Sequence, residues 1–217
     1  MFQDLLSLGL RIADDQRISL AMAQHHYPMS ITQDEFVFVR DHIARRGYRN
    51  AYDLATGFGV SACAIGLGVQ PRGGHVVSMD CYIEETMGAV IRYHDGPPTM
   101  ANTADGYAMA LALRRHFNLD DVIKFQWGCS PADVPAVLTG MALDFAFIDA
   151  AHTDVHLLAD VAAIRSYLVR PYTVMLHDTN QFTAAALDEI GSWFGAPLLM
   201  PQTTGWFGYA LGYYCVE

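Results

Sequence analysis

Residues 53 to 61 read Asp-Leu-Ala-Thr-Gly-Phe-Gly-Val-Ser and combine an acid with two closely spaced glycines. A short apolar stretch ends at Asp53, and Gly57 and Gly59 precede a run of small residues. This order predicts a strand, a tight turn and the start of a helix. Such a turn lets the backbone approach a ligand closely, and a helix N-terminus offers free N–H groups to an anionic group.

The acid indicates which ligand fits this loop. Asp53 would repel a pyrophosphate lying against the turn, whereas S-adenosylmethionine carries an ammonium, a sulfonium and only one carboxylate. The alternative is an NAD-dependent oxidoreductase, because Gly57-x-Gly59-x-x-Ala62 also fits the dinucleotide fingerprint and Asp80 fits its ribose-binding acid. Asp53 and the lack of a central Tyr–Lys pair argue against that alternative.

Three further acids stand where strands are predicted to end. Together with Asp53 they are Asp80, Asp149 and Asp178. Ligands of an open parallel sheet bind outside the carboxyl ends of its strands. One such acid is best explained as a helix N-cap, but four on the same edge predict a functional site.

The remaining sequence alternates strands with helices. Strands are predicted at 75–79, 122–127, 143–148 and 172–176, and a helix with Leu157, Val161, Ile164 and Leu168 on one face separates the last two. This pattern predicts an α/β, Rossmann-like, doubly wound and mostly parallel sheet of seven strands. Residues Leu198 to Val216 are expected to add an antiparallel C-terminal hairpin.

We expect one domain over residues 1–217. Residues 1–48 form an N-terminal helical segment, in which 4–25 are helical and the capping box Thr32-Gln-Asp-Glu35 opens a helix that ends at Gly47. The 81–118 interval is long for a simple crossover and includes a predicted helix over 103–116. It is interpreted either as a lid over the cofactor edge or as a plain structural excursion.

Composition narrows the function classes. The 217 residues are 52% hydrophobic and 17% charged, which argues against disorder, and the net charge of −10 argues against a nucleic-acid partner. No apolar run reaches the ~18 residues of a membrane span. Four dispersed cysteines without a CxxC motif indicate a reduced, cytoplasmic protein. The apolar composition and the aromatic tail are compatible with a homodimer.

The chain resembles the class I S-adenosylmethionine-dependent methyltransferases over residues 50 to 180. It is most similar to small-molecule O-methyltransferases with a strand-four Asp-x-x-His, here Asp149 to His152, and a strand-five His-Asp, here His177-Asp178. The usual first glycine of the loop is Ala55, a small change that still admits the cofactor.

The resemblance implies roles for individual residues. The loop that wraps the methionine portion of the cofactor maps to Asp53, Ala55, Gly57, Gly59 and Ser61. The ribose-binding acid maps to Asp80, the adenine contacts to Cys129 and Ser130, and the acid that faces the methionine and the reacting centre to Asp149.

The reaction requires an acceptor hydroxyl that loses its proton, to a base or with the help of a divalent ion. His152 is the first candidate base and His177 the second, although His152 can equally be structural. Asp149 and Asp178 could share Mg²⁺, Mn²⁺ or Ca²⁺, with His177 or Asn180 as a further ligand. Two certain acids are an incomplete site, so a metal-free enzyme and a non-catalytic cofactor-binding protein stay open. The acceptor is expected to be a small molecule, and Asp160, in mid-helix, is interpreted as structural.

Overall fold

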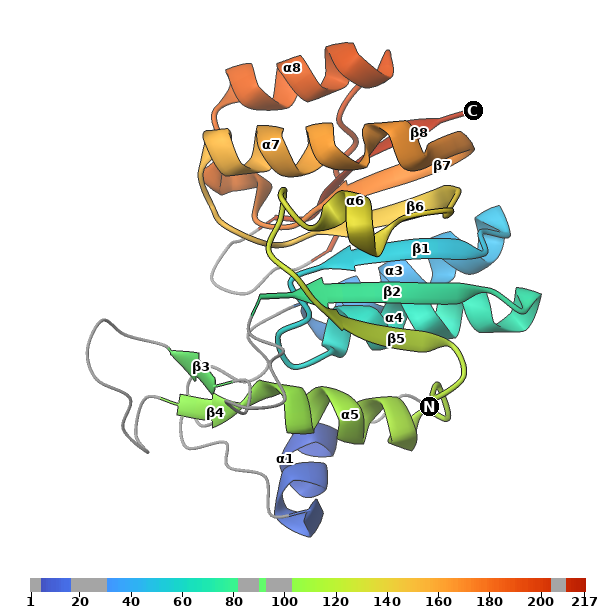
Figure 1. Ribbon diagram of the computed structural model, residues 1–217, viewed down its shortest axis with the longest axis vertical. Coiled ribbons are helices and arrows are strands. Elements are labelled where there is room, and N and C mark those ends of the chain that lie inside the picture. Colours follow the sequence, from blue (N-terminus) through green and yellow to red (C-terminus); the bar gives the residue numbers. More distant parts are fainter. Residues whose placement is uncertain (1–4, 17–30, 82–89, 93–102, 204–209) are drawn as a thin grey trace.

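The computed structural model describes residues 5–16, 31–81, 90–92, 103–203 and 210–217 (Figure 1). Its centre is a six-stranded sheet whose spatial order is β5, β2, β1, β6, β7, β8. All neighbours are parallel except β7 and β8, which are antiparallel. The strands are β1 (Asn50–Leu54), β2 (His75–Asp80), β5 (Ile123–Trp127), β6 (Leu143–Ile148), β7 (Leu168–Leu176) and β8 (Gly212–Val216). The predicted Rossmann-like, mostly parallel sheet is therefore confirmed.

Helices cover both faces of the sheet (Figure 1). One apolar cluster lies between the sheet and α1 (Leu5–Gln16), α3 (Gln33–Arg46), α4 (Val60–Val69) and α5 (Gly106–His116). A second cluster packs the opposite face against α6 (Val134–Val137), α7 (Asp154–Ile164) and α8 (Ala184–Phe194). In the order of the sequence, β2 and β5 are added on one side of β1, and β6, β7 and β8 are then added on its other side. The boundary between the neighbouring strands β1 and β6 is therefore the topological switch point, and ligands of such sheets bind at the carboxyl ends of the strands there.

Smaller elements complete the fold. Short 3₁₀ turns follow α4, α7 and β7, at Gln70–Arg72, Arg165–Tyr167 and Thr179–Gln181. A separate antiparallel pair is formed by β3 (Val90–Arg92) and β4 (Thr103–Asp105), on the side of the sheet where the parallel strands end (Figure 1). Residues 82–89 and 93–102 of the predicted lid lie outside the described residues, as do 17–25 of the predicted first helix.

The capped helix forms as predicted. Thr32 accepts a hydrogen bond from the backbone N–H of Glu35, and the Glu35 side chain accepts one from the N–H of Thr32, which completes the capping box of α3. Gly47 ends the helix in the left-handed conformation that glycine tolerates best. Phe36, Val39 and Ile43 are buried on its inner face.

Two strand predictions need correction. Among the described residues the main sheet has six strands rather than seven, because Leu199 makes only an isolated bridge to Tyr213. Pro197 and Pro201 flank Leu199 and lack the N–H groups that would extend the ladder.

Strand β7 begins at Leu168 rather than at 172, so the predicted α7 position of Leu168 is wrong. Pro171 is tolerated there because it falls in the irregular part of the pairing with β6.

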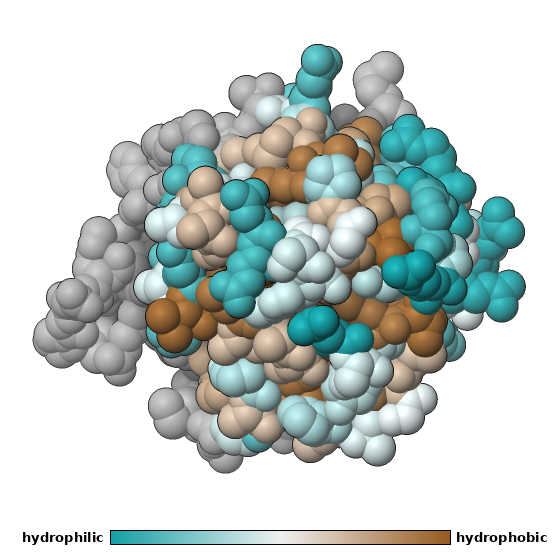
Figure 2. Space-filling view, turned by 90° about the horizontal axis from the view of Figure 1, so that it is seen from above, coloured by the Kyte–Doolittle hydropathy of each residue, from teal (hydrophilic) through white to brown (hydrophobic). Residues whose placement is uncertain are grey.

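The surface over α8 is mixed in character. Hydrophobic and hydrophilic side chains are interspersed on the face seen from above (Figure 2). In the parts of the chain that the structure describes, no helix has the length and hydropathy required to cross a bilayer.

Candidate active site

A cleft of about 340 Å³ opens at the carboxyl ends of the central strands. It lies across the switch point and has the size of a small-molecule or cofactor site. Two of the four predicted strand-end acids, Asp80 and Asp149, line it directly. The other lining residues come from the same strand ends and from α7: Leu54, Ala55, Met79, Cys81, Gly128, Cys129, Ser130, Ala150, Ala151, His156 and Asp160.

The glycine-containing turn forms one wall of this region. Ala55, Gly57 and Gly59 all have positive φ, at 74°, 50° and 78°, so the chain turns sharply before α4 begins. The N–H of Gly57 donates a hydrogen bond to Asp80 Oδ2 at 3.0 Å. Asp80 therefore ties the turn to the end of β2 while it lines the cleft.

Asp53 lies buried behind this wall. Its side chain has no solvent exposure, and its Oδ2 accepts a 2.6 Å hydrogen bond from the Ser78 hydroxyl. Burial raises the pKa of Asp53 to about 7, although hydrogen bonds from Ser78 and Ser61 oppose the rise. Ser61, also predicted to bind the cofactor, is buried in the first turn of α4.

The end of the cleft beside β5 is held together by two acids. Ser130 Oγ donates a 2.5 Å hydrogen bond to Asp160 Oδ1, and the Cys129 N–H donates one to Asp133 Oδ2 at 2.8 Å. Asp160 is buried, which raises the pKa of its carboxyl group. The sequence interpretation of Asp160 as structural accounts for its bond to Ser130 but missed its place in the cleft wall.

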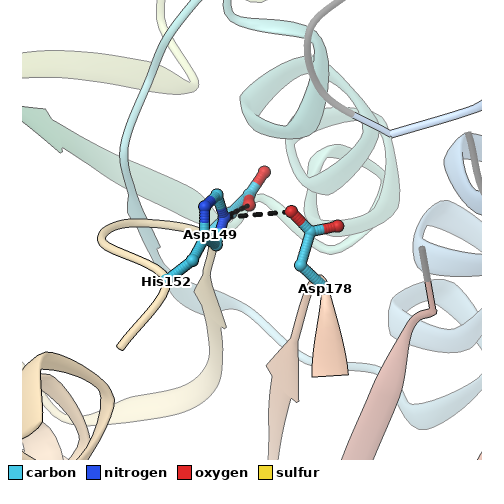
Figure 3. Close-up of side chains that lie close together, drawn as sticks. All are labelled: Asp149, His152 and Asp178. Atoms are coloured by element: carbon cyan, nitrogen blue, oxygen red, sulfur yellow. Dashed lines mark ion pairs between the residues drawn. The ribbon is translucent and has the colours of Figure 1, made fainter. Parts of the chain in front are cut away.

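Asp149, His152 and Asp178 converge at the ends of β6 and β7 (Figure 3). His152 Nε2 lies 2.9 Å from Asp178 Oδ2 and 3.7 Å from Asp149 Oδ1. One donor atom from each residue falls within 4.8 Å of the others, the spacing of a metal-binding group. Asn180, which the sequence offers as a further ligand, accepts a 3.3 Å hydrogen bond at its Oδ1 from the Ala210 N–H.

His177 lies on the buried side of the same carboxylates. Its Nδ1 is 3.0 Å from Asp178 Oδ1 and 3.3 Å from Asp149 Oδ1, and its Nε2 is 3.4 Å from Glu35 Oε2. Both candidate bases therefore contact the same two acids. His152 approaches them from the solvent side and His177 from the interior. Side-chain exposure is 39% for His152 and 4% for His177.

The charges of this group are strongly coupled. The neighbouring carboxylates of Asp149 and Asp178 raise the pKa of His152 to about 9. Burial alone would lower the pKa of His177, but the surrounding carboxylates outweigh it and raise the value far above the ordinary range. Burial would likewise raise the pKa of Asp178, but the two imidazoles beside its carboxylate depress it. A ligand held by Asp149 and Asp178 would therefore compete with the two imidazoles for carboxylate oxygens.

Residues 54–179 match the sequence model of a family described as a methyltransferase domain. This match spans more than half of the 217 residues. The chain belongs to this methyltransferase family. No curated protein sequence is significantly similar to the chain. The predicted assignment to the class I S-adenosylmethionine-dependent methyltransferases is confirmed.

Solved structures share the fold of this methyltransferase. A Bacillus cereus O-methyltransferase in complex with S-adenosylhomocysteine is 14% identical, with a TM-score of 0.68 over 100% of this chain and 93% of that one. A Streptomyces achromogenes O-methyltransferase involved in tomaymycin synthesis, in complex with S-adenosylmethionine, is 11% identical, with a TM-score of 0.66 over 100% and 92%. The S-adenosylhomocysteine-bound methyltransferase PaMTH1 of Podospora anserina is 13% identical, with a TM-score of 0.63 over 100% and 89%.

The methyltransferase has a strained alanine, Ala55, in the turn between β1 and α4. Ala55 has a φ of 74°, a conformation that costs a non-glycine residue about 1–2 kcal/mol. Glycine also gains more backbone entropy on unfolding than alanine does, which lowers the free energy of unfolding by about 0.5–1 kcal/mol and offsets part of that relief. We expect Ala55→Gly to raise the free energy of unfolding in urea by about 0.5–1 kcal/mol. Ala51→Gly, in the middle of β1, should lower it. Equal losses in both variants would contradict the strain at Ala55.

Proposed function

We propose that this methyltransferase transfers the methyl group of S-adenosylmethionine to an oxygen atom of a small molecule. The observation that carries the proposal is the juxtaposition of the cleft with the Asp149–His152–Asp178 group at the switch point of the sheet. Methyl transfer from a sulfonium is an in-line displacement, so the enzyme must hold donor and acceptor in line and help the acceptor lose its proton. The cleft supplies a place for the donor, and the group beside it supplies acids and bases.

The cofactor is assigned to the cleft and the turn beside it. Asp80 lines the cleft at the end of β2, within reach of the ribose hydroxyls of a nucleoside whose adenine lies toward Cys129 and Ser130. The methionine portion would then lie toward the turn of Gly57 and Gly59 and toward Asp149. Asp53 and Ser61 are both buried, so they are assigned to the support of that turn rather than to open contact with the solvent.

The acceptor is assigned to the Asp149–His152–Asp178 group. His152 is the more exposed imidazole and is the one that an acceptor entering from solvent would meet first. We assign the acceptor proton to the neutral form of His152, which becomes more populated as the pH rises toward its pKa of about 9, and we assign His177 the task of holding the two acids from the interior. Two carboxylates and an imidazole also suit a divalent cation, and the nitrogen ligand favours Mn²⁺ over Mg²⁺. Such an ion, when bound, lowers the pKa of an acceptor hydroxyl.

Calorimetry tests the donor. S-adenosylhomocysteine and S-adenosylmethionine should bind to the cleft, and NAD should not, because its pyrophosphate would lie in a cleft lined by the carboxylates of Asp80 and Asp149. Asp80→Ala should weaken S-adenosylhomocysteine roughly ten- to hundredfold, the effect of losing hydrogen bonds to a charged group. Asp188→Ala, an exposed change on α8, is the matched control. Binding of NAD without either methionine nucleoside would refute the proposal in favour of an oxidoreductase.

Turnover tests the acceptor. A panel of phenols, catechols and aliphatic alcohols should be screened for release of S-adenosylhomocysteine, with Mg²⁺, with Mn²⁺ and with EDTA. Product from at least one hydroxyl compound is the expected result, and loss of that product with EDTA would assign the reaction to the cation-assisted class. Tight cofactor binding without any product would favour the binding-only alternative.

A further inference from the structure

Glu35 connects the start of α3 to the candidate active site. Its Oε2 accepts a 2.8 Å hydrogen bond from the Thr32 N–H and lies 3.4 Å from His177 Nε2. These two residues are 142 positions apart in the sequence, on a helix and on a strand end. The side chain that closes the capping box therefore also faces an imidazole of the active site.

Capping alone does not account for this arrangement. A capping-box glutamate needs one oxygen, and glutamine serves as well. Glu35 has no solvent exposure, and its Oε1 is buried without a hydrogen-bond partner among the described residues. Burying a carboxylate is costly unless the group is paired and hydrogen-bonded. His177, itself 4% exposed, is the group that can pair with it.

The imidazole of His177 has carboxylates at both nitrogens. Nε2 faces Glu35, while Nδ1 faces Asp178 Oδ1 at 3.0 Å and Asp149 Oδ1 at 3.3 Å. An imidazole ring is rigid, so fixing Nε2 fixes the direction of Nδ1. The position of Glu35 therefore determines where His177 presents Nδ1 to the two acids.

We propose that Glu35 is a positioning residue for methyl transfer, which orients His177 so that its Nδ1 holds Asp149 and Asp178 in place. The proposal rests on the proposed function, because it assigns Asp149 and Asp178 to the reacting centre. In this view α3 is part of the active-site scaffold, and the chain of contacts runs from Glu35 through His177 to the ends of β6 and β7.

Glu35→Gln separates positioning from capping, because the amide oxygen can still accept the Thr32 N–H while the charge toward His177 is lost. We expect kcat to fall roughly ten- to a hundredfold, the usual effect of removing a group that orients an active-site side chain. The KM for S-adenosylmethionine and the affinity for S-adenosylhomocysteine should stay within about twofold, since Glu35 does not line the cleft. The acceptor in this assay is the compound of the panel that gives product with the wild type.

Thr32→Ala is the matched control, because it removes the hydroxyl that accepts the Glu35 N–H and leaves the carboxylate in place. It should lower the melting temperature without lowering kcat. An unchanged kcat in Glu35→Gln, or an equal loss in Thr32→Ala, would overturn the proposal.

A second readout does not need turnover. Histidine-selective ¹⁵N NMR of the S-adenosylhomocysteine complex should show altered His177 ring signals in Glu35→Gln and wild-type signals in Thr32→Ala. Unchanged His177 signals in Glu35→Gln would overturn the positioning role. If the wild type binds S-adenosylhomocysteine but methylates nothing in the panel, the proposed reaction fails, while this spectrum still decides whether Glu35 orients His177.

Discussion

Asp149→Asn is expected to lower kcat for methyl transfer roughly 100- to 1000-fold, the loss that follows removal of one preorganised electrostatic group from a reacting centre. Asp149 lines the cleft and is also within 3.7 Å of His152 and 3.3 Å of His177, so it touches both the proposed donor site and the proposed acceptor site. Asparagine has nearly the same shape but no charge, and its NH₂ group would face imidazole donors. The variant therefore removes the electrostatic part of the site and retains its volume.

The measurement is single-turnover release of S-adenosylhomocysteine at saturating S-adenosylmethionine, with binding of S-adenosylhomocysteine followed by calorimetry. Binding should weaken about tenfold or less, because only one hydrogen-bonding group of the donor site is changed. Asp188→Asn, on the exposed side of α8, should leave both quantities at the wild-type level. A turnover rate within a few-fold of wild type would remove Asp149 from the reacting centre.

The sequence predicts the strand-end acids well because strand direction alone places them. Parallel strands end on one edge, so Asp80, Asp149 and Asp178 had to approach the same region wherever the helices lay. The capping box of α3 was equally local, since it depends on residues three positions apart. These features require no knowledge of how distant segments pack.

Contacts between distant segments could not be predicted in this way. Glu35 has a complete local explanation as a capping residue, so nothing in the sequence indicates that it also faces His177. Asp160 stands in mid-helix, and only the packing of α7 beside the β5 end brings it to Ser130. The contact of Asn180 is equally non-local, because its side-chain oxygen accepts a hydrogen bond from the Ala210 N–H, 30 positions away.

The glycine turn was predicted for its approach to a ligand, but the structure adds a second constraint at Gly59. A Cβ atom at this position would lie 2.7 Å from Ala110 Cβ and 2.8 Å from Ala110 Cα in α5. Ala110 is fully buried, and its Cα belongs to the helix backbone, so the clash cannot be relieved by a side-chain rotation. Gly59 is therefore required for the close packing of the turn on α5.

Gly59→Ala is accordingly expected to lower the free energy of unfolding by about 2–4 kcal/mol. The left-handed φ of 78° accounts for about 1–2 kcal/mol and the overpacking against α5 for about 1–3 kcal/mol, less about 0.4–1 kcal/mol regained from the stiffer unfolded chain. Such a loss is a large share of the ~5–15 kcal/mol that stabilises a typical domain. Urea denaturation monitored by tryptophan fluorescence measures it.

Gly140→Ala isolates the steric part of this loss. Gly140 has a φ of 77°, almost the same as Gly59, but a Cβ there would meet no atom within 4 Å. Gly140→Ala should therefore lower the free energy of unfolding only by the cost of the left-handed backbone conformation, about 1 kcal/mol. Because Gly59 also begins α4 beside the proposed donor site, Gly59→Ala should weaken S-adenosylhomocysteine binding, and Gly140→Ala should not. Equal destabilisation of the two variants would mean that α5 shifts to accommodate the added methyl group at little cost in free energy. The turn would then be constrained by its backbone conformation alone.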